Sequence, residues 1–177
     1  STGIGQADIF LAKYTSAGAY RWAHAFNTPS ESFGAKIDTD GSGNIYFTGR
    51  TFGPVDFDPS TAENILTPSS SDIFLSKFDT NGNHLFAFNM GGTSSDTGLA
   101  LKIEPDGDII LGGNTRRVID FDPYDGTLIR TNANGSSSGL NDSFIARYRS
   151  CTNPDLPTLT RSASATCVGG EVTLNVT

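Results

Sequence analysis

Short apolar runs separated by polar, glycine-containing turns follow one another along most of the chain. Residues 35–38 and 44–49 are two such runs, and the turn between them contains Asp-Gly-Ser-Gly, which predicts a β-hairpin. The runs at residues 8–14 and 18–26 predict a second hairpin. No segment has the apolar spacing of an amphipathic helix, so the pattern predicts an all-β, antiparallel protein.

The chain is internally repeated. The run Asp-Ile-Phe-Leu-Ala-Lys-Tyr at residues 8–14 returns at 72–78 and, in divergent form, at 142–148. A second landmark, Val-Asp-Phe-Asp-Pro at residues 55–59, returns at 119–123 as Ile-Asp-Phe-Asp-Pro. Residue 72 follows residue 8 and residue 119 follows residue 55 by the same 64 residues, so this period marks a structural unit of about four strands.

The predicted strands are apolar on both faces. Residues 9–12 and 45–47 are apolar at successive positions, whereas a lone antiparallel sheet leaves one face polar. Antiparallel sheets that are buried on both faces and repeat at a fixed period are typical of a radial stack of blades. We therefore predict tandem four-stranded antiparallel blades of a partial β-propeller over residues 1–150, about two and a quarter blades in all.

The landmarks resemble those of the bacterial β-propeller repeat called SBBP. The resemblance covers about residues 7–149 and rests on three motifs in the family's order: Ile-Asp-x-Asp-Gly-x-Gly-Asn-Ile-Tyr-x-Thr-Gly, Val-Asp-Phe-Asp-Pro and Ser-Asp-Ile-Phe-Leu-x-Lys. The second copy lacks two residues that match Ser42-Gly43 and gains two near 99–100, and Ser143 stands where the other copies have isoleucine. The resemblance implies a repeat module of a large bacterial protein.

A change of composition follows residue 150. Two prolines open residues 151–177 like a linker, and the Cys-x-Gly-Gly turn with its alternating end is similar to the first strands of the Ig-like modules of secreted bacterial surface proteins. We expect a linker and the beginning of an Ig-like β-sandwich here. The strand count is not a whole number of four-stranded blades and the first residue is not Met, so we expect an excerpt of a larger protein.

The two cysteines, Cys151 and Cys167, both lie in this C-terminal segment. We predict a disulfide between them, which favours an oxidising, extracytoplasmic setting; two free thiols remain the alternative. We therefore expect an extracellular or cell-surface location.

Charge excludes some classes of partner. The net charge is −7, from 12 Lys and Arg against 19 Asp and Glu, and the cations are not clustered, which argues against nucleic-acid binding. No apolar run approaches the roughly 18 residues of a membrane-spanning helix, so we predict no membrane span.

One turn resembles the opening of an EF-hand calcium loop. Oxygen-bearing side chains occupy positions 1, 3, 5 and 7, but Gly49 replaces the glutamate of position 12. An ordinary hairpin turn is therefore the favoured interpretation, no cofactor is predicted, and calcium is the alternative. The calcium ligands in that alternative are Asp38, Asp40, Ser42 and Asn44.

Several aspartates recur with the repeat. Asp56 with Asp58, and Asp120 with Asp122, have the spacing of paired carboxylates, but catalytic pairs are usually unique in a chain. Recurrence favours structural hydrogen bonds, with a repeated ion site as the alternative. We assign the structural repeat motif to Asp8, Asp72, Asp142, Asp56, Asp58, Asp120 and Asp122.

The remaining polar and aromatic candidates have structural interpretations as well. His24 and His84 do not align with each other and have no ligand spacing, so we take them as ordinary strand positions. Tyr20, Trp22 and Phe26 have side chains that can stack on a sugar, but their alignment with Leu85, Phe86 and Met90 favours core positions. No Gly-x-Ser-x-Gly nucleophile motif is present, and no catalytic residue is predicted.

These observations predict a non-catalytic extracellular repeat module. It would be a scaffold or an adhesive binding surface of a large secreted or cell-surface bacterial protein. Its partners would be neighbouring blades and domains of the same chain and a protein or glycan ligand. We also expect exposed apolar faces at the two ends of the stack. One alternative is the propeller part of a carbohydrate- or peptide-active enzyme whose active site lies elsewhere, and another is a calcium-stabilised repeat.

Overall fold

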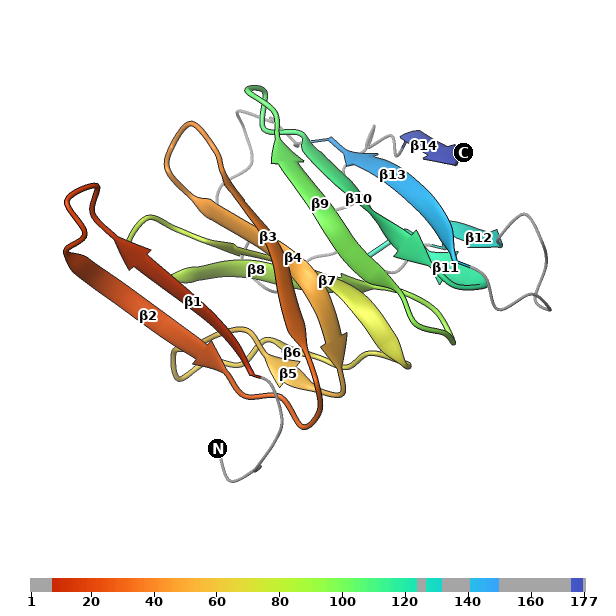
Figure 1. The fold of residues 1–177 in the computed structure, drawn as a ribbon, viewed down its shortest axis with the longest axis horizontal. Helices are drawn as coiled ribbons and strands as arrows, with labels where there is room; N and C mark the ends of the chain where they lie inside the picture. The colour runs from red at the N-terminus through yellow and green to blue at the C-terminus, as the bar shows by residue number, and fades with distance from the viewer. Residues whose placement is uncertain (1–7, 124–126, 132–140, 150–172, 177) are drawn as a thin grey trace.

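The computed structural model of the chain describes residues 8–123, 127–131, 141–149 and 173–176, and no helix occurs within these residues. The prediction of an all-β, antiparallel protein is confirmed (Figure 1). The strands are β1 (Ile9–Tyr14), β2 (Tyr20–Phe26), β3 (Phe33–Thr39), β4 (Ile45–Phe52), β5 (Val55–Asp56), β6 (Ile65–Leu66), β7 (Ser71–Phe78), β8 (His84–Met90), β9 (Thr97–Ile103), β10 (Ile109–Thr115), β11 (Val118–Asp120), β12 (Ile129–Thr131), β13 (Asp142–Tyr148) and β14 (Thr173–Val176).

Two four-stranded antiparallel sheets have the same strand order. The first sheet has the order β3-β4-β7-β8 and the second has the order β9-β10-β13-β14. Strands β1 and β2 pair with each other and correspond to β7 and β8. Residues 34–50 and 72–90 lie in one sheet, which agrees with the expected repeat unit of about four strands. Each four-stranded sheet carries an inserted hairpin, β5–β6 after β4 and β11–β12 after β10.

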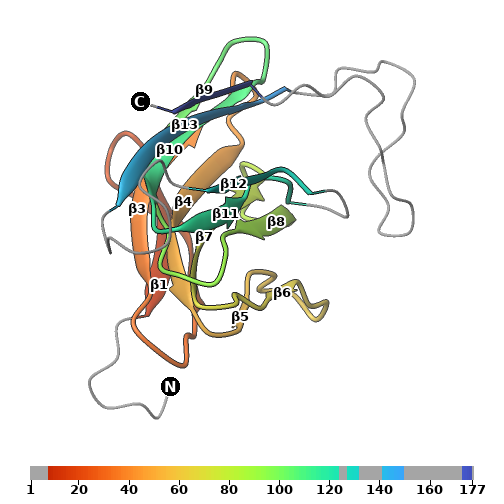
Figure 2. The ribbon, with the colours of Figure 1, turned by 90° about the vertical axis from the view of Figure 1, so that its right-hand side faces the viewer.

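The three sheets are stacked, with an apolar core on each side of the middle one (Figures 1 and 2). Consecutive residues of β7 contribute to different cores, since Phe74 belongs to the first and Ile73 and Leu75 belong to the second. All three side chains are fully buried. The middle sheet is therefore buried on both faces, which explains its continuous apolar runs.

The inserted hairpins fill the space between successive sheets. The ring of Phe57 follows β5 and lies 5.3 Å from that of Phe26 in the two-stranded sheet and 4.8 Å from that of Phe74 in the middle sheet. Phe121, which follows β11, packs in the same way 5.0 Å from Phe144 of the next sheet. The Asp-Phe-Asp-Pro landmark recurs because each intersheet space needs one such phenylalanine.

Four hairpins close with the same three-residue loop. In each, a glycine N–H donates to the carbonyl three residues earlier, and the glycine has a φ of 78° to 89°. This left-handed conformation is accessible to glycine without the steric cost that a side chain adds. The turns predicted at residues 15–18 and 39–43 are confirmed, whereas the expected loss of two residues matching Ser42-Gly43 is wrong, because the loop closed by Gly107 is as long as the one closed by Gly43.

The C-terminal strand β14 pairs antiparallel with β13 and completes the second four-stranded sheet. The rest of the predicted linker and Ig-like segment, including Cys151 and Cys167, lies outside the described residues. The disulfide and the Ig-like module therefore stay predictions. Within the described part of the chain, no helix is long and apolar enough to span a membrane.

Candidate functional site

The aspartates of the Asp-Phe-Asp-Pro landmark hold their hairpins in the same way in both copies. One oxygen of Asp56 accepts hydrogen bonds from the N–H of Asp58 at 3.0 Å and of Asn64 at 2.9 Å. The equivalent oxygen of Asp120 accepts from Asp122 N–H at 3.0 Å and Leu128 N–H at 2.8 Å. Each carboxylate therefore spans the loop of its own hairpin, which is a structural task.

The aspartates of the other landmark lie at strand starts. Asp72 Oδ2 accepts hydrogen bonds from Ser69 N–H at 3.0 Å and from the Asn89 side-chain amide at 3.2 Å. Burial raises the pKa of Asp72, although these hydrogen bonds oppose the rise. Asp8 accepts the N–H of Thr28 at 3.1 Å, and Asp142 pairs in register with Thr115.

The calcium-loop candidates do not converge on one point. Asp40, Ser42 and Asn44 lie together because Asp40 accepts the N–H groups of the other two at 3.0 and 2.9 Å. Asp38 instead reaches β9, where it accepts Ile103 N–H at 2.8 Å and the Lys102 ammonium at 3.0 Å.

The Asp40 turn recurs at Asp79, which accepts the N–H groups of Asn81 and Asn83 at 2.8 and 2.9 Å. Among the described residues, no three His, Cys, Asp or Glu side chains are placed to hold a metal ion together. The oxygen-rich turn is therefore explained by its own hydrogen bonds, and calcium binding stays a hypothesis.

Two histidines depart from the repeat. The pairing of Tyr14 with Tyr20 matches that of Phe78 with His84, so His84 corresponds to Tyr20. His24 corresponds to Phe88 by the same offset of 64 residues. The expected alignment of Tyr20 with Leu85 is thus wrong by one residue, and Tyr20 is exposed. Of the three aromatic residues expected in the core, Phe26 is buried and Trp22 packs against the core.

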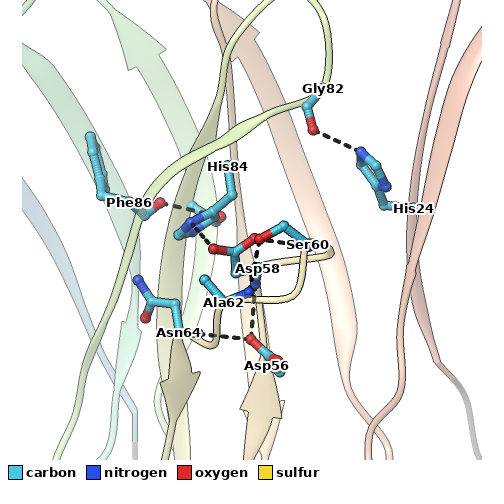
Figure 3. A network of polar contacts seen from close by, with 10 residues as sticks. His24, Asp56, Asp58, Ser60, Ala62, Asn64, Gly82, His84 and Phe86 are labelled. Carbon is cyan, nitrogen blue, oxygen red and sulfur yellow. Dashed lines mark hydrogen bonds and ion pairs between the residues drawn. The ribbon is translucent and has the colours of Figure 1, made fainter.

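The fold brings His24 and His84 to one pocket (Figure 3). Its volume is about 310 Å³, and it is formed by β2, the loop after β5 and the β7–β8 hairpin. We call it the histidine pocket. The residues that line it are His24, Asp58, Pro59, Ser60, Gly82, Asn83 and His84.

His84 is the buried member of the histidine pocket. Its side chain is 5% exposed, and its Nδ1 lies 3.8 Å from Asp58 Oδ2. Burial lowers the pKa of His84 against the opposing effects of Asp58, Asp56 and a hydrogen bond with the backbone of Phe86. Its ring also faces the backbone carbonyl of Phe86 (Figure 3).

His24 joins the two-stranded sheet to the middle sheet. Its Nε2 lies 2.8 Å from the carbonyl oxygen of Gly82, and because a carbonyl only accepts, Nε2 carries the proton and donates. The imidazole stacks on Trp22 at 5.1 Å and on Phe78 at 5.7 Å. Nearby, Lys13 donates to the backbone oxygen of Thr80 at 3.0 Å.

The geometry of the histidine pocket is better suited to binding than to proton transfer. The 3.8 Å separation of His84 and Asp58 exceeds the hydrogen-bond range that a coupled acid and base need. Asp58 Oδ1 also accepts the N–H of Ser60 at 2.9 Å, so this carboxylate shapes its loop. Sequence spacing did not reveal the pocket, because its two histidines come from different sheets. Their failure to recur was the available signal.

Comparison with known proteins gives two distant relatives. No family model matches the chain. It is 29% identical over 130 residues, 66% of this chain, to an uncharacterized WD repeat-containing protein of Acanthamoeba polyphaga mimivirus. It is 22% identical over 177 residues, 94% of this chain, to the regulatory protein FlaEY of Caulobacter vibrioides. The chain spans 9% and 18% of the lengths of these two proteins.

Proposed function

We propose that the stacked sheets are successive blades of a β-propeller and that the chain is a non-catalytic binding module. The observation that carries this proposal is the middle sheet, which is buried on both faces and is flanked on each side by the same inserted phenylalanine. Four-stranded antiparallel blades that repeat around an axis have this property. The WD-repeat name of one distant relative agrees with it, since WD repeats build four-stranded blades.

The spacing between sheets supports a radial arrangement. At one edge β3 approaches β9 closely, because Asp38 hydrogen-bonds to the backbone of Ile103 at 2.8 Å. Farther from this edge, Phe57 and Phe121 are inserted between the sheets. The two inserted hairpins project on the same side of the sheets (Figure 2). Sheets that touch at one edge and need filling farther out form wedges, as blades around an axis do.

A non-catalytic role follows from which residues recur. The carboxylates with the spacing of an acid and base, Asp56 and Asp58, belong to a hairpin that the next repeat forms again. We place the module in a large secreted or cell-surface bacterial protein as scaffold or adhesive surface, on the basis of the SBBP resemblance and the predicted disulfide between Cys151 and Cys167. A protein or glycan would bind at the histidine pocket, a concave site whose two histidines depart from the repeat.

Binding and turnover can be tested together. The purified chain is applied to arrays of bacterial surface glycans and secreted proteins, and each bound ligand is recovered and weighed by mass spectrometry. We expect saturable binding and an unchanged ligand mass. A cleaved ligand would support the enzyme alternative instead, and the absence of binding on both arrays would reject the binding role.

A matched variant locates the ligand. His24→Phe with His84→Tyr replaces both histidines by the residues at the equivalent positions of the repeat, Phe88 and Tyr20, so the fold should be retained. We expect this double variant to lose ligand binding and to keep the β-sheet circular dichroism spectrum. Undiminished binding would place the ligand away from the histidine pocket.

A further inference from the structure

Three equivalent phenylalanines have very different exposure. Phe10, Phe74 and Phe144 occupy the same position of the repeated strand motif in β1, β7 and β13. Phe74 is 0% exposed and Phe144 is 3% exposed, but Phe10 is 76% exposed. The sequence therefore supplies a core residue at a place where the described chain has no core.

The buried copies show what such a phenylalanine packs against. Phe74 lies opposite Gly49 of β4, and a Cβ at Gly49 would come within 2.9 Å of the Phe74 ring. The ring of Phe57 covers Phe74 at 4.8 Å. Each buried phenylalanine thus sits between a glycine on the neighbouring strand and the phenylalanine of an inserted hairpin.

The second copy repeats this arrangement. Phe144 lies opposite Gly113 of β10, where a Cβ would come within 3.0 Å of its ring, and Phe121 covers it at 5.0 Å. Since the two contacts occur in both complete sheets, they define the environment that the motif phenylalanine requires.

Strand β1 lacks both contacts within the described residues. It pairs with β2 along one edge, whereas the edge that in β7 pairs with β4 has no partner there. Tyr14, which corresponds to the fully buried Phe78, is exposed as well. An apolar strand with a free edge is a template for pairing with another strand.

We propose that the free edge and outer face of β1 bind a β-hairpin segment of the same repeat type. The bound segment adds an antiparallel strand next to β1 with a glycine opposite Phe10, as Gly49 lies opposite Phe74. Its following hairpin places an aromatic ring on Phe10, as Phe57 does on Phe74. The surface continues an interface that the chain already forms twice, and addition of a strand to a sheet edge is a known mode of peptide recognition.

The shape of the β1 surface restricts which strands can bind there, in addition to its apolar character. A Cβ on Gly49 would overlap the Phe33 carbonyl of its own hairpin and lie 2.9 Å from the Phe74 ring, so the glycine is needed both by the hairpin and by the phenylalanine opposite. Strands that carry any residue other than glycine opposite Phe10 are therefore excluded as partners of β1. The proposal rests on the internal repeat and does not require that the sheets close into a ring.

A labelled synthetic peptide of residues 31–59, which covers β3, β4 and Phe57, is the probe. Fluorescence anisotropy with the full chain should show saturable one-to-one binding. A Gly49→Val peptide should bind at least about tenfold more weakly, because a Cβ at this position overlaps the Phe33 carbonyl of the hairpin and crowds the phenylalanine opposite. Absence of saturable binding, or equal binding of the two peptides, would overturn the proposal.

Two protein variants complete the test. Phe10→Ala should weaken peptide binding by about tenfold without changing the melting temperature, since Phe10 is exposed in the free chain. Ile129→Ala removes a comparably exposed apolar side chain on β12 and should leave binding unchanged.

Sedimentation analysis tests whether a second copy of the chain binds at this face instead. Self-association that depends on Phe10 and persists in excess peptide would assign this face to a second copy and reject the hairpin. A chain that binds glycan or protein on the arrays but not this peptide would reject only this inference and leave the proposed function standing.

Discussion

The hydroxyl of Thr115 donates a 2.6 Å hydrogen bond to the buried carboxylate of Asp96, whereas the equivalent hydroxyl, on Thr51, is buried without a partner among the described residues. The difference comes from one substitution between the repeats. Position 32, which is 64 residues before Asp96, is serine, and its hydroxyl accepts the N–H of Phe52 at 3.2 Å. Asp96 accepts both the hydroxyl of Thr115 and the N–H of Arg116.

Valine at the two threonines should therefore have opposite effects. Thr51→Val removes an unpaired buried hydroxyl and should leave the free energy of unfolding unchanged or raise it by about 1 kcal/mol. Thr115→Val removes a donor from a buried carboxylate and should lower it by about 1–3 kcal/mol. Urea denaturation of both variants measures the contrast, and equal effects would contradict it.

Asp96 should make stability fall as pH rises. Burial, followed by the nearby charge of Asp72, raises the pKa of Asp96 from 3.8 to about 6 against its hydrogen bonds. The folded chain then binds more protons than the unfolded chain between these values. This contribution is present at low pH and is lost as pH rises through about 6, at most about 3 kcal/mol.

Urea denaturation at intervals between pH 4 and 7 measures this slope. Asp96→Asn should flatten the slope. It should also lower the overall stability, because the N–H groups of Gly92 and Arg116 donate to the two carboxylate oxygens and an amide NH₂ cannot accept from one of them. A slope unchanged in Asp96→Asn would show that another group titrates.

Arg117 should be replaceable by glycine with a gain. Its φ is 74°, and at the equivalent position of the first repeat Gly53 has a φ of 90°. Arg117→Gly should stabilise the fold by about 1 kcal/mol, which corresponds to about 2–4 °C in melting temperature. The reverse change, Gly53→Ala, should destabilise it, because the new Cβ would also meet the Pro29 ring at 2.6 Å. Differential scanning calorimetry measures both shifts.

The inserted phenylalanine should be among the costliest residues to truncate. Phe57 is fully buried between two sheets, so Phe57→Ala should cost about 3–5 kcal/mol of unfolding free energy. Ile65→Ala on the same hairpin removes an exposed side chain and serves as the control, with an expected change below about 0.5 kcal/mol. Similar losses in the two variants would show that the hairpin does not fill the intersheet space.

Much of the sheet architecture could be predicted because it is repeated. The motif of β7 matches that of β1, and the period alone was enough to place residues 34–50 and 72–90 in one sheet. The expected alignment of Tyr20 with Leu85 departed from the period, which assigns Tyr20 to His84. The pairing keeps this assignment because the same register shift occurs between Lys13 and Tyr14 and between Lys77 and Phe78.

The histidine pocket could not be predicted in the same way. His24 and His84 are 60 residues apart in the sequence and meet only because two sheets stack and an inserted hairpin closes the gap between them. The repeat period identifies residues that recur in every copy. The two histidines of the pocket do not recur, and they become neighbours only through tertiary packing.

The inserted hairpin β5–β6 has a buried base that packs in the core and an exposed tip. Phe57 and Leu66 at the base are buried in the core and residues 59–60 line the histidine pocket, while residues 61–63 at the tip are exposed. The tip can therefore gain or lose sequence without a packing penalty. Foreign peptides grafted there would be displayed on a rigid support, and natural diversification of the repeat has a place to occur that leaves the sheets intact.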